Sequence, residues 1–324
     1  MAIVVLVEES DGKIKKSSLE AIAYAAALNK QMNEDDVVAL ALGNQVSSEE
    51  LESLGKFGAN RVLHVTDERL NQGVIQAYAS VVDQAMNETG AKVLVLAKSS
   101  LADPVASRVA IKQQAALGAN VVDLPDLSDG FVVKRSIYTG KAFAYTKLDR
   151  DKKIIALRKN AITPEEGTET ATVENFSATL SDTDFDATIT NTEKSEGDIL
   201  LPEADIVVSG GRGLKGPENW EMIEELADTL GAATGCSKPV SDMGWRPHHE
   251  HVGQTGVKVS PTLYVAVGIS GAIQHLAGVN SSKYILVVNQ DAEAPFFKAA
   301  DYGVVGNAFE IVPQLTEKIK ASQN

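Results

Sequence analysis

The chain has 324 residues, the length of about two average domains, and 44% of them are hydrophobic, which is enough for ordinary globular cores. A formal net charge of −14 argues against nucleic acid as a main partner. The single cysteine, Cys236, excludes an intramolecular disulfide and fits a reducing compartment, so we expect a cytoplasmic protein. No apolar run approaches the ~20 residues of a membrane-spanning helix, so no membrane insertion is expected.

The first 120 residues alternate between apolar runs typical of buried strands and segments with apolar residues at helical spacing. Strands are predicted at 3–7, 37–42, 61–65 and 92–97, and helices at 17–29, 48–57, 72–87 and 104–117. Pro104 suits the first turn of the last of these helices. The alternation predicts a largely parallel sheet with helices on both faces.

After residue 120 the pattern changes to short β-rich segments at 131–138, 141–148 and 153–159, which we expect as antiparallel strands at the sheet edge. The acidic segment 163–198 is either a linker or, since apolar residues alternate in it, a pair of edge strands. The alternating residues are Phe176, Ala178 and Leu180, followed by Phe185, Ala187 and Ile189. We favour the strands, with the linker at 191–198 and an N-terminal domain over 1–198.

A second α/β unit is predicted over 199–324, and we expect it to be doubly wound. Strands are predicted at 205–209, 263–267, 284–288 and 303–305, and helices at 217–230, after Pro295 and at 311–321. The strand at 263–267 runs into a Gly-Ile-Ser-Gly turn, and a helix should open near Gly271, with Ile273 and Leu276 in the core. Backbone N–H groups at such a turn suit a phosphate, and Thr255 and His275 could reach a ligand there.

A second glycine turn, SGGRGL at 209–214, follows the strand at 205–209. It matches neither the dinucleotide fingerprint nor a P-loop, and by itself it could be a close helix–sheet packing turn. Two such turns at the carboxyl ends of strands in one unit favour a nucleotide site.

Other clusters of reactive side chains are weaker. His248, His249 and His251 surround Glu250 without metalloprotease spacing, in a segment flanked by Pro and Gly, so we expect a solvated loop and no metal site. Cys236 has no evident catalytic partner and is expected to be a small buried thiol. Without a convincing nucleophile or acid–base set, the chemistry would belong to a bound cofactor.

Five segments together resemble the α subunit of electron transfer flavoprotein: SGGRGL, VGQTG at 252–256, LYVAVGISGAIQHLAG at 263–278, VVNQDAEAPFF at 287–297 and ADYGVVG at 300–306. The resemblance implies an FAD-binding electron carrier rather than a self-sufficient enzyme. It implies a heterodimer with a β subunit, electrons taken from acyl-CoA dehydrogenases, and delivery to a membrane quinone oxidoreductase. Two alternatives stay open: a non-redox adenine-nucleotide module, and part of an NADH-using electron-bifurcating complex.

The resemblance also implies where FAD binds. Arg212 approaches the phosphates and ribose, and Ser237 and Lys238 lie beside the flavin. Val252, Gly253, Gln254 and Thr255 run along the isoalloxazine ring, with the Thr255 hydroxyl at N5. Ser270, Gly271, Ala272, Ile273, Gln274 and His275 hold the pyrophosphate and the pyrimidine edge, with His275 near the C2 carbonyl. Asn289 lies on the adenosine side, and Asn307 and Ala308 lie towards the adenine.

Lys238, Thr255 and His275 are the expected flavin-tuning residues, because reduced flavins carry negative charge near N1 and the C2 oxygen. This chain departs from the family at two positions. The family usually has arginine at Lys238, so the charge is kept but the planar fork is lost. It often has aspartate at Asn307, which puts a charged contact there in doubt.

Overall fold

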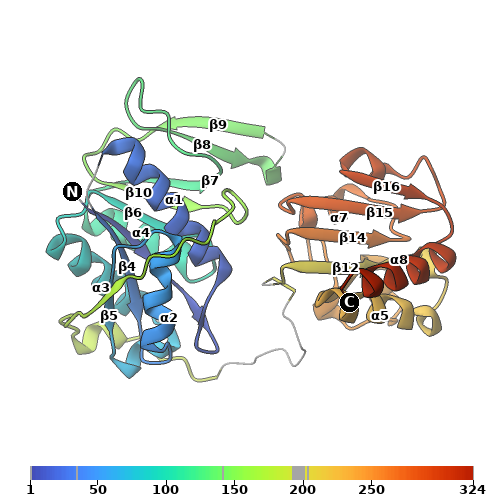
Figure 1. Cartoon of the computed structure of the whole chain (residues 1–324), viewed down its shortest axis with the longest axis horizontal. Helices are drawn as coiled ribbons and strands as arrows, with labels where there is room; N and C mark the ends of the chain where they lie inside the picture. The colour runs from blue at the N-terminus through green and yellow to red at the C-terminus, as the bar shows by residue number, and fades with distance from the viewer. Residues whose placement is uncertain (1, 34–35, 141, 192–200, 203, 324) are drawn as a thin grey trace. The chain divides into compact units, whose positions relative to one another are not determined.

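The computed structural model describes residues 2–33, 36–140, 142–191, 201–202 and 204–323. The chain divides into two compact units, Met1–Thr192 and Glu193–Asn324, each built on its own sheet (Figure 1). The predicted domain boundary at residue 198, and the predicted linker except for residue 191, lie outside the described residues.

The N-terminal unit contains a nine-stranded sheet in the order β11-β5-β4-β1-β6-β10-β7-β8-β9. From β11 to β7 all neighbours are parallel, and β8 and β9 continue the edge as an antiparallel pair. The strands are β1 Ala2–Leu6, β4 Asp36–Leu42, β5 Arg61–Val65, β6 Val93–Ala97, β7 Ala116–Val121, β8 Val132–Ile137, β9 Ala142–Lys147, β10 Lys153–Leu157 and β11 Thr172–Asn175. A separate hairpin joins β2 Glu9–Ser10 and β3 Lys13–Ile14.

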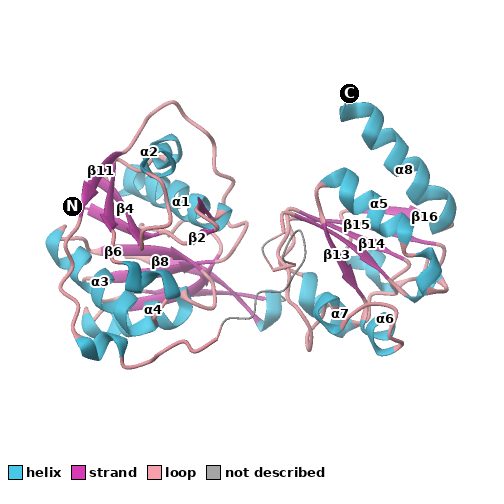
Figure 2. Cartoon of the chain, turned by 90° about the horizontal axis from the view of Figure 1, so that it is seen from below, coloured by secondary structure: helices cyan, strands magenta, loops and turns pink. Residues whose placement is uncertain are grey.

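Helices cover both faces of this sheet, as the alternation predicted. Figure 2 shows α1 and α2 on one side and α3 and α4 on the other. Adjacent strand residues therefore enter different cores, Val5 on the side of α1 and Val4 on the side of α3. The helical segments are α1 Lys16–Met32, α2 Ser48–Glu52, η1 Ser53–Phe57, η2 Glu68–Gln72, α3 Ile75–Glu88, α4 Ala102–Lys112, η3 Tyr138–Gly140 and η4 Asp182–Phe185.

Two predictions for the segments between residues 104 and 159 are wrong. The segment at 153–159 does not form an antiparallel edge strand, because β10 is parallel and lies between β6 and β7. Its residues Ile154 to Leu157 are buried in succession, and a continuous apolar run marks a strand covered on both faces. The helix starting near Pro104 ends at Lys112 rather than at residue 117, because the chain from Ala116 onward enters β7.

The acidic segment after residue 163 forms one strand rather than two. Strand β11 pairs in parallel with β5 and ends before the alternating residues begin. Phe176, Ala178 and Leu180 pack against the core outside any strand ladder. Ser181 then forms a capping box with Asp184 and starts the short helix η4, which replaces the second predicted strand.

The C-terminal unit contains a five-stranded parallel sheet in the order β13-β12-β14-β15-β16, which confirms the doubly wound prediction. Figure 2 shows α5 and α8 on one face and α7 on the other. The strands are β12 Ile206–Gly210, β13 Ala233–Cys236, β14 Leu263–Val267, β15 Tyr284–Asn289 and β16 Tyr302–Val305. The helical segments are η5 Arg212–Leu214, η6 Pro217–Asn219, α5 Glu221–Leu230, α6 Lys238–Asp242, η7 His248–Glu250, α7 Ile273–Val279, η8 Pro295–Ala299 and α8 Ala308–Gln323.

The strand order places a switch point between β12 and β14. The chain leaves β12 towards β13 on one side and leaves β14 towards β15 on the other. Open α/β sheets bind ligands in the crevice outside the carboxyl ends of two such strands. Both glycine turns found in the sequence lie there, because SGGRGL starts in the last two residues of β12 and GISG follows β14.

Candidate functional site

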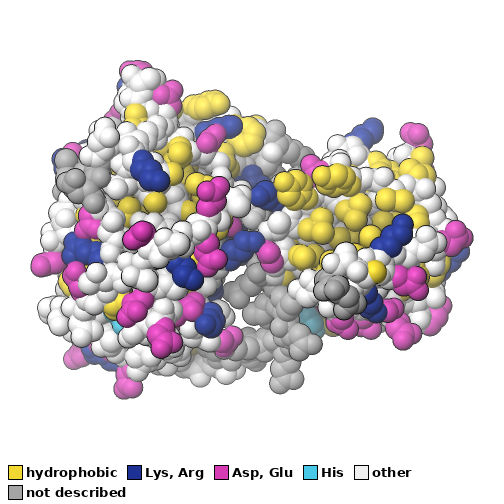
Figure 3. Space-filling view, viewed as in Figure 1, with side chains coloured by type: hydrophobic (Ala, Val, Ile, Leu, Met, Phe, Trp, Pro, Cys, Tyr) yellow, Lys and Arg dark blue, Asp and Glu magenta, His cyan; other side chains and the backbone are white. Residues whose placement is uncertain are grey.

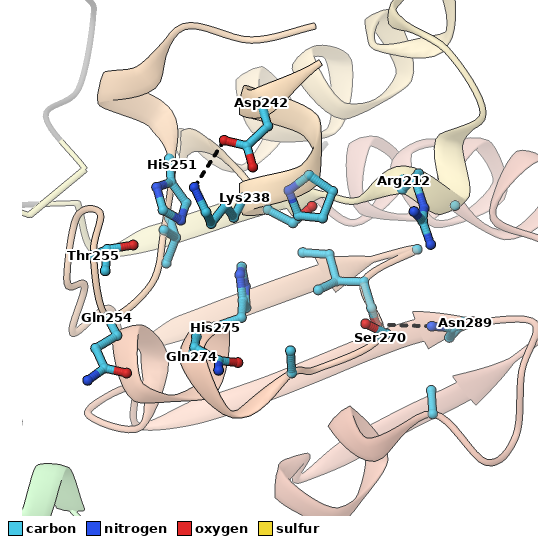
Figure 4. Close-up of a pocket in the computed structure, with 18 of the residues that line it drawn as sticks. Arg212, Lys238, Asp242, His251, Gln254, Thr255, Ser270, Gln274, His275 and Asn289 are labelled. Atoms are coloured by element: carbon cyan, nitrogen blue, oxygen red, sulfur yellow. Dashed lines mark hydrogen bonds and ion pairs between the residues drawn. The ribbon is translucent and has the colours of Figure 1, made fainter. Parts of the chain in front are cut away.

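A cavity of about 720 Å³ lies in the C-terminal unit, and both glycine turns contribute to its wall (Figure 4). This volume is within the usual range of cofactor and ligand pockets. The lining residues are Arg212, Gly213, Ser237, Lys238, Pro239, Asp242, His251, Val252, Gln254, Thr255, Gly268, Ile269, Ser270, Ala272, Gln274, His275, Asn289, Asp291 and Ala294.

The two glycine turns pack backbone against backbone. The N–H of Gly211 donates to the carbonyl of Val267 at 2.8 Å, and the N–H of Gly213 donates to that of Gly268 at 3.0 Å. A Cβ at Gly211 would lie 2.2 Å from the Gly268 oxygen, so no larger residue fits there. SGGRGL is therefore a close-packing turn, which was the simpler explanation of its glycines. The same packing places both glycine turns on the wall of one cavity.

The turn after β14 offers a row of backbone donors. The N–H groups of residues 269–272 make no hydrogen bond with the part of the chain that the structure describes. The carbonyls of Ile269 and Ser270 are held by the Asn289 side-chain amide at 3.0 Å and by the Phe296 N–H at 3.1 Å. Ile269, Ser270 and Ala272 line the cavity, and free N–H groups so close together suit an anionic ligand.

The helix after this turn differs from its prediction. It begins at Ile273 rather than near Gly271, and it has only seven residues. Ile273 is 65% exposed and is not a core residue, whereas Leu276 packs against the core as expected. Because the helix is so short, the turn itself and not a long helix dipole provides the anion-binding groups.

His275 reaches the cavity from α7 and is held in a fixed orientation. Its Nε2 atom shares a hydrogen bond of 2.8 Å with the hydroxyl of Tyr264, a fully buried residue of β14. Its ring packs edge-on against Phe296 at 5.7 Å, and its buried Nδ1 has no hydrogen-bond partner of normal geometry among the described residues. Burial, and secondarily the neighbouring His251, lower the pKa of His275 to about 4, so the ring is neutral near pH 7.

Lys238 and Asp242 line the cavity as an ion pair one helical turn apart. Their charged atoms are 3.0 Å apart, and both side chains are 56% exposed. The charge of Lys238 is thus partly neutralised before any ligand binds, a feature the sequence did not reveal.

His251 is the main functional candidate that the sequence reasoning missed. The predicted solvated loop is wrong for His251, which is 2% exposed and lines the cavity, and for Glu250, which is buried and paired with Arg246. His248 and His249 are exposed, as predicted. The sequence signal that could have indicated its burial is Val252-Gly253 directly after it, because a buried valine also holds the residue before it against the protein. Cys236 is buried as expected, and burial raises the pKa of its thiol to about 12.

The structure brings most of the predicted site residues together. Those that line the cavity are Arg212, Ser237, Lys238, Val252, Gln254, Thr255, Ser270, Ala272, Gln274, His275 and Asn289. Gly253, Gly271, Ile273, Asn307 and Ala308 do not line it. The Asn307 side chain instead accepts from the Phe309 N–H and donates to Glu310 at the start of α8, and Ala308 is in the core.

Further cavity residues were not predicted individually. They are Gly213, Pro239, Asp242, Gly268, Ile269, Asp291 and Ala294. Gly213, Gly268 and Ile269 belong to the two turns that the sequence did single out, whereas Asp291 and Ala294 come from the segment after β15, whose position only the fold reveals.

Comparison with known proteins identifies the family. A family model described as "Electron transfer flavoprotein domain" matches residues 3–181, and one described as "Electron transfer flavoprotein FAD-binding domain" matches residues 200–280. The chain belongs to the electron transfer flavoprotein α-subunit family. Its cofactor is FAD.

Three relatives named electron transfer flavoprotein subunit alpha align over almost the whole chain. That of Bacillus subtilis (strain 168) is 35% identical over 322 residues, covering 98% of this chain and 97% of the relative. Those of Syntrophomonas wolfei subsp. wolfei (strain DSM 2245B / Goettingen) and Mycobacterium leprae (strain TN) are both 36% identical, over 323 and 321 residues, with 98% of each chain covered.

The cavity fits FAD on its own geometry. Its volume is in the cofactor range, and free N–H groups of residues 269–272 are available for a pyrophosphate. His251 and His275 lie at the end of the cavity near Lys238 (Figure 4), and their buried Nδ1 atoms make no hydrogen bond of normal geometry with the described residues. In the described part of the chain, no helix is long and apolar enough to cross a membrane, and no cluster of His, Cys, Asp or Glu could hold a metal.

Proposed function

We propose that this chain is the FAD-carrying subunit of a two-subunit electron carrier. It takes electrons from acyl-CoA dehydrogenases and related dehydrogenases and passes them to a membrane quinone oxidoreductase. Bound FAD supplies the redox chemistry, and the chain's own residues bind and orient the cofactor and respond to its charge.

The observation that carries the proposal is the asymmetry of the cavity. One end holds Lys238, His251 and His275, and Arg212 lies towards the other end (Figure 4). Cationic and N–H donor groups at the flavin end favour the state with added electrons, because they stabilise its negative charge. Arg212 and the free N–H groups after β14 hold the phosphates.

The proposed residue roles follow the lining of the cavity. Ser237 and Lys238 approach the flavin from α6, Val252 to Thr255 run along its ring, and His275 approaches its pyrimidine edge. The hydrogen bond of 2.7 Å from the Gln254 N–H to the Gln274 carbonyl ties the Thr255 loop to α7. Asn289 lies on the adenosine side, and Asn307 and Ala308, which do not line the cavity, lie towards an adenine that extends beyond it.

A heterodimer with a β subunit is part of the proposal. The edge strand β16 exposes Tyr302, Val304 and Val305, and Figure 3 shows hydrophobic side chains gathered over this part of the C-terminal unit. An exposed apolar sheet edge is prone to unwanted pairing, and proteins usually cover it. A partner subunit over this edge would supply that cover.

The test is the purified two-subunit complex. We expect a yellow protein with one FAD per complex, bleached by an acyl-CoA and its dehydrogenase and reoxidised by the membrane quinone oxidoreductase. A colourless complex would contradict the redox function. Two FAD per complex and rapid reduction by NADH would instead identify an electron-bifurcating member of the family.

A further inference from the structure

The His251 ring is enclosed by its own loop at the cavity and does not lie on the loop surface. Its N–H and carbonyl are bonded to His248 and Val257, and its Nδ1 is buried without a hydrogen-bond partner among the described residues. A Cβ at Gly256 would lie 2.6 Å from Nδ1, and one at Gly253 would lie 3.2 Å from Nε2. The glycines of this loop therefore make room for the imidazole at the cavity.

Among the residues that the structure describes, the charges around His251 leave the imidazole without an acidic partner of its own. On its own segment it faces His248, with ring centroids 5.6 Å apart, and Glu250, which is bonded to Arg246 at 2.6 Å. Helix α6 contributes the Lys238–Asp242 pair, α7 contributes His275, and β13 contributes the neutral thiol of Cys236. Both nearby carboxylates are thus already paired with a cation.

In these surroundings the neutral imidazole is favoured. Burial, followed by the charges of His248 and Lys238, lowers the pKa of His251 below its ordinary value, and Asp242 offsets only part of this. A negative charge added in the cavity would raise the pKa of His251 and favour the imidazolium.

We propose that His251 accepts a proton when the flavin is reduced, so that electron transfer into this site is coupled to proton uptake. The inference rests on the proposed function. One electron enters from a one-electron reductant, and one proton moves from solvent to a ring nitrogen of His251. No bond to the cofactor forms or breaks, and on reoxidation the proton returns to solvent while the electron passes to the acceptor.

His251 suits this role better than His275. The Nε2 of His275 is already bonded to Tyr264, and its surroundings hold it neutral to about pH 4. His251 has no such bond with the described residues, and its ring centroid is 5.6 Å from that of the exposed His248, which can exchange protons with solvent.

The proposal predicts the sign of a pH effect. Proton uptake on reduction makes reduction more favourable as pH falls, between the lowered pKa of His251 in the oxidised state and its raised pKa in the reduced state. Within that window the one-electron equilibrium changes tenfold per pH unit, about 59 mV. Above and below the window this contribution is constant.

The experiment measures the first reduction potential of the FAD-loaded complex from about pH 5.5 to about pH 8.5. We compare the parent with His251→Gln, which removes the titrating group, and with His249→Gln, an exposed neighbour that does not line the cavity. We expect the parent and His249→Gln to share a pH-dependent step that His251→Gln lacks. Identical profiles for all three proteins would overturn the proposal.

A second measurement needs no variant. Carbon and nitrogen chemical shifts of the histidine rings, recorded on the isotope-labelled parent complex near pH 7, should show neutral His251 in the oxidised state and imidazolium in the diamagnetic, two-electron-reduced state. An unchanged His251 signal in a complex that binds FAD and is reduced would refute this inference alone. Failure to bind FAD would instead count against the proposed function.

Discussion

The charge at Lys238 should raise the first reduction potential of the bound flavin, and replacing Lys238 by alanine should lower it. A unit charge about 4 Å away contributes about 1 kcal/mol in water and about 4 kcal/mol at an effective dielectric near 20. With about 1.4 kcal/mol per 59 mV, these limits correspond to roughly 40 to 170 mV. Lys238 is 56% exposed and paired with Asp242, so we expect about 40 mV, the lower limit.

The ion pair supplies an internal control of opposite sign. Asp242 also lines the cavity, 3.0 Å from the Lys238 ammonium, so Asp242→Asn should raise the potential by a similar amount. The double variant should lie close to the parent, because it removes both charges. Lys238→Arg keeps the charge and should change little.

Spectroelectrochemical titration of these four variants measures the first reduction potential and tests the prediction. Lys318→Ala, on the exposed face of α8, serves as a matched lysine control. Raising the salt concentration should shrink the differences, because half-exposed charges are screened. If Lys238→Ala and Asp242→Asn both titrate within about 15 mV of the parent, roughly a quarter of a tenfold step, neither charge lies near the flavin.

Three further predictions concern stability and cofactor retention. Because the pKa of buried His275 is lowered to about 4, the unfolded chain binds more protons than the folded chain below about pH 6.5, and the free energy of unfolding should fall by up to about 3 kcal/mol between pH 6.5 and 4. In urea titrations His275→Gln should reduce this pH dependence, and an unchanged pH dependence would contradict the prediction. Gly211→Ala should abolish FAD retention, because its Cβ would meet the Gly268 oxygen. The control Gly90→Ala has open space around it and should keep FAD and lower the free energy of unfolding by only about 1 kcal/mol, so equal FAD retention by the two variants would disprove the prediction. Arg246→Ala should lower the free energy of unfolding by about 1–3 kcal/mol, because it leaves the carboxylate of Glu250 buried and unpaired; urea curves superimposable on the parent's would show that the pair contributes nothing.

Local patterns determined most of the elements and the place of the site. Apolar runs and helical spacing identified most strands and helices of both units, because those patterns reflect which faces are buried. The two glycine turns located the cavity wall, since only glycine permits a backbone approach as close as that between Gly211 and Gly268. The specific motifs around His275 indicated the family and its cofactor.

Tertiary structure decided what depends on contacts between distant segments. Sequence proximity suggested that β10 joins the hairpin before it, yet its buried run inserts between β6 and β7. His251 looks like its exposed neighbours in sequence, and only the packing of its ring against Gly256 shows that it lines the site. The pairing of Lys238 with Asp242 depends on the short helix α6, because neither residue type by itself indicates a partner.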